Sequence, residues 1–198
     1  MNKEFELEEN ISIDNFHLLS KNCKKLIFDE HLDIIERLIK TMMSEKRFEH
    51  SLSVAKTARK LAIANHLDPK EAYIAGILHD VTKYFSLEEH LAYLNYYDKD
   101  KCDVLEPILH SYSAVYFIKE KFNYYNKNVL NAIYHHTDAK SHSKLAMILY
   151  IADKREPLRG IDDDILATAY IDLDKAFWMM KEDVKEYIKK KHERNGIN

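Results

Sequence analysis

The stretch GILHDVTKYF, residues 76–85, places a histidine and an aspartate side by side directly after an apolar run. Imidazole and carboxylate groups bind divalent metal ions and transfer protons, so His79 and Asp80 could form part of a metal centre. They could equally be a hydrogen-bonded polar pair near the end of a helix. The spacing of the other histidines and aspartates bears on which interpretation holds.

Further ligand-type residues have apolar residues three, four or seven positions away, so each is expected on the inward face of its own helix. They are His50, His79, His110, His136 and Asp153. A single inward histidine is more often a hydrogen-bonded core residue than a ligand. An ionised aspartate in a core, however, is costly unless it is paired. A divalent cation would satisfy these groups together with Asp80, so spacing alone leaves both interpretations open.

Glycine is rare in this chain, with only three residues among 198. A dinucleotide-binding fingerprint or a Walker loop needs several glycines close together, because the backbone must approach phosphate closely. Both sites are therefore excluded. Few glycines and prolines, with many leucine, lysine, glutamate and alanine residues, predict an all-α chain. The net charge of −3 provides no broad basic surface, so no nucleic-acid partner is expected.

The chain length suits one domain, residues 29–198, preceded by an N-terminal extension of uncertain order, residues 1–28. Cys23 and Cys102 belong to no metal or redox motif, and the first residues are acidic rather than a leader. The longest apolar run, residues 145–152, is too short to span a bilayer. We therefore expect a cytoplasmic protein with no membrane partner.

Apolar periodicity and capping residues predict where the helices lie. One helix is expected to open at Asp68 and to end in His79 and Asp80. Residues 84–101 are expected to form a short helix and a loop, and the last helix is expected to start near Asp164 and to fade into a solvated tail. The other helices are expected to begin near residue 30, near Phe48, between residues 103 and 107, at Val129 and at Ser143.

Several segments together resemble the YqeK family of the HD superfamily of metal-dependent phosphohydrolases. The match covers about residues 46–177, and it includes the order His50, then His79 and Asp80, then a distant Asp153. The segments are RFEHSLSVAKTARKLA, GILHDVTK, HSYSAVYFIKEKF, AIYHHTD and ILYIADKREPLRG. The resemblance implies an all-helical HD bundle with a dinuclear metal site, commonly holding iron, and the activity of a symmetrical bis(5′-nucleosyl)-tetraphosphatase.

The resemblance also implies which residues bind the two metal ions. The first ion would be held by His50, His79, Asp80 and Asp153, and the second by Asp80, His110 and His136. His135 precedes His136 directly, but His136 stands before Thr137, as the family's ligand does, and it fits the helical phase. Two divalent ions with two carboxylates would keep a positive charge, which attracts phosphate and lowers the pKa of a bound water.

Two cationic residues are predicted to act on a phosphate chain. Lys83 shares the helical face of Asp80, where it could position a phosphate oxygen or assist the leaving group. Arg159 could clamp a phosphate, although pairing with Glu156 or Asp162 would explain it nearly as well. The predicted catalytic residues are thus Asp80 and Lys83, and the predicted substrate-binding residues are Lys83, Thr137 and Arg159.

The remaining histidines and two aromatic residues near the HD motif are assigned to packing or to the surface. Tyr84 and Phe85 could shape a base pocket, but core or loop packing is the better explanation for each. His142 is the surface histidine most expected to approach the site. The histidines assigned to the surface are His17, His31, His66, His90, His142 and His192.

The predicted reaction is the hydrolysis of diadenosine tetraphosphate to two ADP, with a dinucleoside polyphosphate or another nucleotide as the partner and a homodimer left open. The alternative enzyme is another HD-type phosphohydrolase, such as a nucleotidase or an alarmone hydrolase. The alternative from a different class is a non-catalytic HD-like scaffold. Such a scaffold could lose ligands freely, whereas all six ligand positions are filled here.

Overall fold

Helices form all the regular secondary structure in the described residues, 11–159 and 164–194, of the computed structural model. This confirms the predicted all-α fold class. Short helical segments are η2 (Lys99–Lys101), η3 (Ile118–Phe122) and η4 (Pro157–Arg159). The α-helices are α1 (Ile13–Phe16), α2 (Lys21–Glu30), α3 (Leu32–Thr41), α4 (Glu45–Ala64), α5 (Pro69–Leu78), α6 (Leu87–Tyr97), α7 (Glu106–Phe117), α8 (Lys127–His135), α9 (Lys144–Arg155), α10 (Asp164–Ala169) and α11 (Leu173–Arg194).

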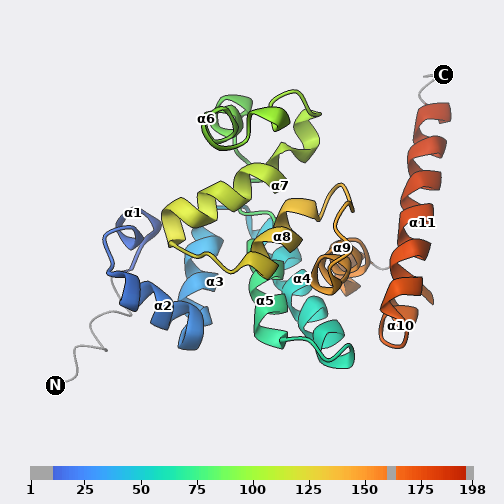
Figure 1. Ribbon diagram of the computed structural model, residues 1–198, viewed down its shortest axis with the longest axis horizontal. Coiled ribbons are helices and arrows are strands. Elements are labelled where there is room, and N and C mark those ends of the chain that lie inside the picture. The colour runs from blue at the N-terminus through green and yellow to red at the C-terminus, as the bar shows by residue number, and fades with distance from the viewer. Residues whose placement is uncertain (1–10, 160–163, 195–198) are drawn as a thin grey trace.

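The helices α4, α5, α8 and α9 form the centre of the molecule, and α7 crosses beside them with α6 farther out (Figure 1). The helices α1 to α3 lie on one side of this centre, and α10 and α11 lie on the other (Figure 1). The helix α9 is buried from Leu145 to Ala152, as predicted for a helix that crosses the core, although α5 and α7 are more apolar over their full length. Asp153 follows this buried run directly.

The closest helix contact, between α4 and α5, depends on Gly76. A Cβ atom on Gly76 would lie 2.4 Å from the Ala55 Cα atom and 2.7 Å from the Ala55 nitrogen. Any larger residue would push the two helices apart, so glycine is required here for close approach. The contact sets the His50 ring, on α4, 5.4 Å from the ring of His79, which follows α5.

Side-chain caps define where the site-bearing helices begin. Asp68 caps α5 as predicted, because its Oδ1 atom accepts hydrogen bonds from the Lys70 and Glu71 backbone nitrogens at 2.7 and 3.2 Å. The corresponding caps of α4, α8 and α9 are Ser44, Asn126 and Ser143. Two predicted ligands lie at the C-terminal ends of these helices: His79 is the C-cap residue of α5, and His136 is the C-cap residue of α8.

The C-terminal segment forms two helices where the sequence predicted one. Tyr170, Ile171 and Asp172 separate α10 from α11. Asp172 Oδ1 accepts a hydrogen bond from the Lys175 backbone nitrogen at 3.0 Å, so this aspartate caps a new helix rather than continuing the old one. The outer half of α11, residues 181–194, is largely exposed, which confirms the predicted solvated tail over the residues described.

Residues 11–30 contain α1 and α2, which periodicity did not predict. Their aromatic residues join the main core, where Phe16 and Phe28 are at most 3% exposed. The Phe16 ring meets the Phe122 ring edge-on at 5.2 Å, so contacts with distant residues hold this segment. The division of the chain at residue 28 stays a prediction.

Candidate metal centre

Six side chains predicted as metal ligands meet between the central helices and α7. They are His50 from α4, His79 and Asp80 directly after α5, His110 from α7, His136 directly after α8 and Asp153 from α9. His79, Asp80, His110 and His136 are at most 4% exposed. The side chains of His50 and Asp153 are 12% and 16% exposed, so the cluster reaches solvent on that side.

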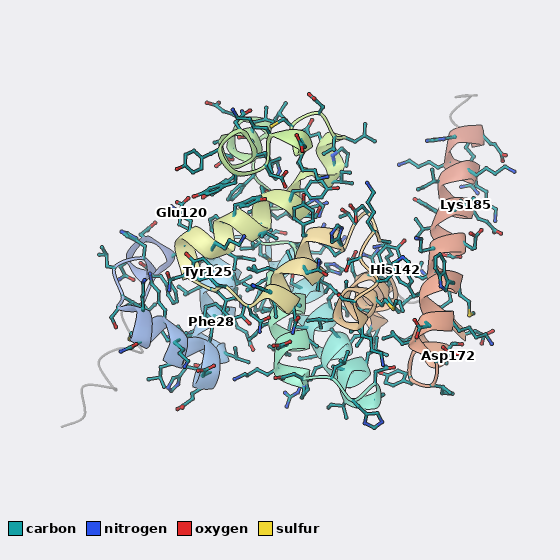
Figure 2. The ribbon with its side chains drawn as sticks, viewed as in Figure 1. Phe28, Glu120, Tyr125, His142, Asp172 and Lys185 are labelled. Carbon is teal, nitrogen blue, oxygen red and sulfur yellow. The ribbon has the colours of Figure 1, made fainter. Side chains whose placement is uncertain are left out.

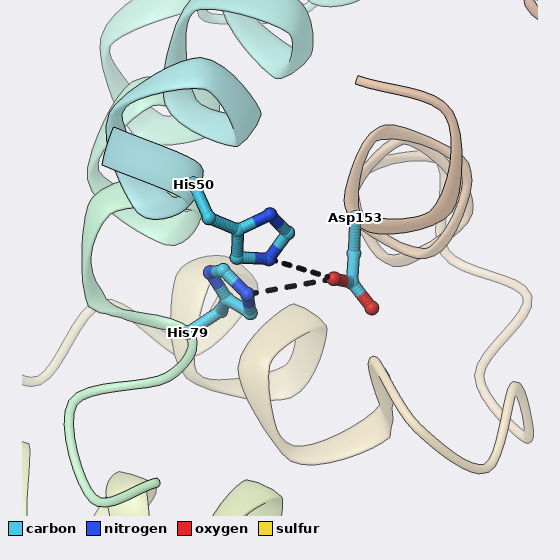
Figure 3. A group of neighbouring side chains, drawn as sticks. All are labelled: His50, His79 and Asp153. Atoms are coloured by element: carbon cyan, nitrogen blue, oxygen red, sulfur yellow. Dashed lines mark hydrogen bonds and ion pairs between the residues drawn. The ribbon is translucent and has the colours of Figure 1, made fainter. Parts of the chain in front are cut away.

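In the first group, His50 and His79 point at the same oxygen of Asp153 (Figure 3). The His50 Nε2 atom lies 3.2 Å from Asp153 Oδ1, and the His79 Nε2 atom lies 3.7 Å from it. One ligand atom from each residue lies within 4.8 Å of the others. Bonds of about 2.0–2.2 Å to one metal ion bring ligand atoms to separations of this order.

In the second group, the two oxygens of Asp80 face different histidines. Its Oδ2 atom lies 3.4 Å from His79 Nε2, and its Oδ1 atom lies 3.1 Å from His110 Nε2. The His136 Nε2 atom is 3.8 Å from the same Oδ1 atom and 3.2 Å from His110 Nε2. Asp80 therefore stands between two sets of nitrogen ligands, as a carboxylate that bridges two ions would.

Hydrogen bonds to the Nδ1 atoms orient three of the rings. His79 Nδ1 donates to the Gly76 carbonyl at 2.7 Å, and His136 Nδ1 donates to the Ile133 carbonyl at 2.6 Å. His50 Nδ1 donates to Glu156 Oε1 at 3.2 Å. These bonds aim each Nε2 atom at the cluster, which is the orientation that metal-binding histidines require.

The His79 Nε2 atom tests whether the cluster suits a metal ion. It is buried, and it has no hydrogen-bond partner among the described residues. A buried nitrogen without a hydrogen bond is costly, while a divalent cation held between it and the Asp80 and Asp153 carboxylates would satisfy it. The donor set of imidazoles and carboxylates suits first-row divalent metals. The residues therefore fit a metal centre.

The protonation of the groups follows from their burial and neighbours. Burial opposes a charge on His79, but Asp80 and Asp153 outweigh it and raise the pKa of His79 to about 10. Burial lowers the pKa of His110 to about 4 and also lowers the pKa of His136. Without metal, His79 thus holds a proton that a cation must displace, while His110 and His136 are already neutral.

The two carboxylates stay ionised despite their surroundings. Burial favours the neutral form of Asp80, but His79 holds the pKa of that carboxyl well below its usual range. Burial acts in the same direction on Asp153, where Lys154 keeps the pKa low. Arg47 Nη1 also donates to Asp80 Oδ2 at 2.8 Å, on the oxygen that faces His79.

Among the described residues, four cationic side chains lie beside the cluster, and the sequence predicted two of them. Lys83 Nζ lies 3.2 Å from His110 Nδ1, and burial lowers the pKa of this lysine. Arg159 Nε donates to the Asp153 carbonyl at 2.8 Å. Arg47 and Lys154 were missed, although Arg47 precedes His50 by three residues, a spacing that puts both on one helical face.

Glu156, which orients His50, was also missed as a partner of the site, although it follows Asp153 by three residues. Arg159 Nε lies 4.0 Å from Glu156 Oε1, so part of the predicted alternative pairing is present. The other suggested partner, Asp162, lies outside the described residues.

The structure separates His136 from its neighbour His135. His135 Nδ1 lies 2.9 Å from Asp138 Oδ1, outside the cluster. Thr137 Oγ1 lies 2.9 Å from Ser111 Oγ, which holds it beside the His110 and His136 segments. His142, labelled in Figure 2, is exposed. Its ring contacts those of Phe177 and Trp178 on α11.

One of the histidines assigned to the surface is buried, and that prediction was wrong. His90 is 4% exposed, and its Nδ1 atom lies 2.8 Å from Ser113 Oγ. Ser113 Oγ lies 3.1 Å from Thr82 Oγ1, which donates to the His110 carbonyl at 2.9 Å. The polar context of His90 in the sequence gave no sign of this hydrogen-bonded chain behind the predicted ligand His110.

Of the two aromatic residues that follow His79 and Asp80, Phe85 packs against other rings and Tyr84 lies on the surface. Phe85 packs against Tyr93 and Phe117. Tyr84 is 58% exposed, and its hydroxyl lies 2.8 Å from Ser44 Oγ.

Within the described ranges, no helix is both long and apolar enough to cross a membrane.

Comparison with known proteins defines the class of this chain. The HD domain family model matches residues 47–158, so the chain belongs to the HD domain family. A solved structure of a predicted HD superfamily hydrolase involved in NAD metabolism, from Clostridium acetobutylicum, is similar, with a TM-score of 0.71 at 29% identity. It covers 81% of this chain and 88% of its own.

The names of curated relatives agree with the resemblance to the YqeK family. A protein of Staphylococcus aureus named symmetrical bis(5′-nucleosyl)-tetraphosphatase is 34% identical over 71% of this chain and 75% of its own length. A probable nicotinate-nucleotide adenylyltransferase/Ap4A hydrolase of Mycoplasma genitalium is 36% identical over 90% of this chain. The chain spans 56% of that relative and 38% of its Mycoplasma pneumoniae counterpart, so it corresponds to part of each.

Proposed function

We propose that this chain is a metal-dependent phosphohydrolase that cleaves diadenosine tetraphosphate symmetrically into two ADP molecules. The observation that carries the proposal is the buried Asp80 carboxylate, whose two oxygens face different histidines of one cluster. The substrate is supported by the names of the Staphylococcus aureus, Halalkalibacterium halodurans and Bacillus subtilis relatives, each a symmetrical bis(5′-nucleosyl)-tetraphosphatase.

The proposed cofactors are two divalent metal ions, with iron as the expected metal. His50, His79, Asp80 and Asp153 would hold one ion, and Asp80, His110 and His136 would hold the other. When bound, the ions supply positive charge to phosphate oxygens and lower the pKa of a water. The hydrogen bonds of His50, His79 and His136 to Glu156 and to backbone carbonyls keep the rings aimed inward.

The cations around the cluster would bind the phosphate chain. A tetraphosphate carries negative charge on every phosphate, and Arg47, Lys83, Lys154 and Arg159 offer four positive groups beside Asp80, His110 and Asp153. Arginine forks suit phosphate oxygens, so Arg159 and Arg47 would orient the chain. Thr137, next to His136, would contribute its hydroxyl to the same surface.

In the reaction, a water oxygen bonds to one central phosphorus, and the bond from that phosphorus to the central bridging oxygen breaks. The bridging oxygen leaves as part of the second ADP. Lys83 would donate a hydrogen bond to this oxygen as negative charge develops, a role favoured by the lowered pKa of its ammonium group. Asp80 would act as the ligand that the two ions share.

Product analysis tests the proposal. The purified, metal-loaded protein is incubated with diadenosine tetraphosphate in ¹⁸O-labelled water, and the products are separated and weighed. We expect only ADP, with label in half of the molecules. AMP with ATP as products would contradict symmetrical cleavage. Faster hydrolysis of a mononucleotide or an alarmone would favour another HD phosphohydrolase, and no hydrolysis at full metal content would favour a scaffold.

A further inference from the structure

A second pocket, unrelated to the metal cluster, lies between α3, α4 and α5. Its volume is about 720 Å³, within the range of about 300–1,000 Å³ that small-molecule sites occupy. It is formed by the first turns of α5 and by the second half of α4, whereas the metal ligands lie after the end of α5 and near the start of α4. The two sites therefore occupy opposite ends of the same helix pair.

The α4 wall of this pocket is a stripe of cationic residues that ends in an apolar one. Lys56, Arg59, Lys60 and Ile63 are spaced three, four and seven residues apart, so they share one face of the helix. Lys70 of α5 contributes a further cation from across the pocket. Four cations around one pocket create a local positive potential on a chain whose net charge is −3.

The three cations that α4 contributes to this pocket have no acidic partner among the described residues. In the part of the chain that the structure describes, no carboxylate lies within ion-pair distance of Lys56, Arg59 or Lys60. Lys70, in contrast, lies 3.4 Å from Asp29 Oδ1. Like charges four residues apart on a helix repel each other, so the Lys56–Lys60 pair is unfavourable unless an anion lies nearby.

The one carboxylate among the lining residues, Glu36, accepts a hydrogen bond from another lining residue. The Tyr73 hydroxyl donates a hydrogen bond of 2.6 Å to Glu36 Oε1. This bond draws Glu36 toward the buried Tyr73 ring at the α5 wall. With one carboxylate against four cations, the lining keeps a net charge of +3. Leu32 and Ile63 add apolar surface beside the charges.

We propose that this pocket binds a small phosphorylated organic molecule, such as a nucleotide. The cations Lys56, Arg59 and Lys60 bind its phosphates, and Leu32 and Ile63 contact its organic part. A concave pocket of this size favours a small molecule over a membrane surface or a nucleic acid, because the net negative charge of the chain opposes binding to extended polyanions.

The binding experiment uses the full, metal-loaded chain labelled with ¹⁵N. It is titrated with methylenediphosphonate and with the α,β-methylene analogue of ADP, neither of which is hydrolysed at the bridging carbon. We expect saturable amide shifts in residues 56–63 and 69–73, with tighter binding of the nucleotide analogue. Shifts confined to the metal centre would overturn the proposal, and equal affinities for the two compounds would overturn the role of the apolar residues.

Two matched variants distinguish binding at this pocket from a general effect of the positive charge of the chain. Replacing Lys56, Arg59 and Lys60 by Gln should weaken binding at the pocket more than about 10-fold, since the variant loses every charged hydrogen bond from α4 to the phosphates. Replacing Lys185, Lys189 and Lys190 by Gln removes the same charge from exposed positions of α11 and should leave the affinity unchanged. Equal affinities of the two variants would contradict the site.

A sedimentation experiment with lipid vesicles tests whether the cations of the pocket bind a membrane surface instead. Wild-type protein is sedimented with phosphatidylserine vesicles beside both triple variants. If only the pocket variant fails to sediment and wild-type protein does not bind methylenediphosphonate, the patch is a membrane surface and the small-molecule proposal is wrong. Far-ultraviolet circular dichroism of each variant checks that the helices remain, which is expected because all six positions are exposed.

Discussion

Ionisable residues are arranged in opposite ways at the metal cluster and on the outer half of α11. At the cluster, Asp80 meets Arg47 and His110, and Asp153 meets His50, so each contact joins distant parts of the chain. On α11, Lys185 pairs with Glu182 and Lys190 with Glu186, only three or four residues away. All four of these α11 side chains are at least 67% exposed.

Buried charges such as those of the cluster are costly unless every group has a partner, whereas the exposed charges of α11 are not. Exposed pairs contribute about 0–1 kcal/mol and cost nothing to solvate. Burying Asp80 and four imidazoles removes them from water, and the attraction between them repays this only when every group has a partner. The outer part of α11 stands clear of the other helices in Figures 1 and 2, where Lys185 is labelled. Its charges therefore remain in water, while those of the cluster are buried and fit a bound metal ion.

The largest expected effect follows from removing the shared carboxylate. Asp80→Ala should lower metal affinity more than about 100-fold and abolish hydrolysis, because even the outer partners of metal ligands are worth roughly 10–100-fold. Metal content and turnover measure the effect, and circular dichroism should show intact helices. Asp183→Ala is the matched control, because Asp183 pairs with Arg155 at 2.6 Å outside the cluster. An Asp80→Ala protein with normal activity would disprove the site assignment.

Replacing His135 and replacing His136, the neighbouring histidines at the C-terminal end of α8, should affect metal content very differently. His136→Ala should reduce the bound metal from two equivalents toward one, because His136 Nε2 lies 3.8 Å from Asp80 Oδ1. His135→Ala should change metal content little, because the His135 ring bonds to Asp138 instead. Elemental analysis of both proteins provides the comparison. The reverse order of effects would shift the ligand by one residue.

Lys83 and Arg159 should affect kinetics without affecting metal content. Each lost charged hydrogen bond to substrate is worth roughly 1.5–3 kcal/mol, or about 10- to 150-fold in kcat/KM. Lys83→Ala should lower kcat, because its partner is charge that develops as ADP leaves, and Arg159→Ala should mainly raise KM. Steady-state kinetics distinguishes the two roles. Wild-type constants in both variants would assign these residues to the solvated surface.

Local signals in the sequence were sufficient for most of the fold. The Asp68 cap and the apolar periods predicted the helices from α3 to α9, because each depends on neighbours along the chain. The positions of His50 and Asp153 on inward stripes were predicted in the same way. The roles of the six ligands, in contrast, came from resemblance to a family and stay predictions.

Features that depend on contacts between distant segments could not be predicted. His90 has a polar sequence context, and its burial depends on Ser113 of α7 and on the packing of Phe85. The helices α1 and α2 are held by aromatic contacts such as Phe16 with Phe122 rather than by periodicity. Arg47 could have been found from its spacing to His50, but its bond to Asp80 requires the close contact of α4 and α5.

His90 predicts a smaller, pH-dependent effect. Burial lowers its pKa from the ordinary value of 6.5, so the folded protein favours the neutral ring. The stability contributed by His90 is complete above pH 6.5 and is lost as the pH falls below that value through the lowered pKa. His90→Asn keeps a hydrogen-bonding group near Ser113 but cannot titrate. Metal-free wild-type protein should therefore lose more stability between pH 7 and pH 5 than the variant, by at most about 1.4 kcal/mol per pH unit. Urea unfolding at each pH measures this, and parallel curves would contradict it.

The smallest effect is expected on α11, and it completes the comparison with the cluster. Lys190→Gln breaks the pair with Glu186, whose ammonium–carboxylate distance is 3.7 Å and whose side chains are 67% and 69% exposed. Water and salt already screen these charges, so the free energy of unfolding should fall by no more than about 0.5 kcal/mol. The difference should vanish at about 1 M salt, where the screening length is only about 3 Å. Urea unfolding at low and high salt measures both values. A loss above about 1 kcal/mol that persists in high salt would mean that the outer half of α11 is desolvated by a partner, and its charges would then belong with those of the buried cluster.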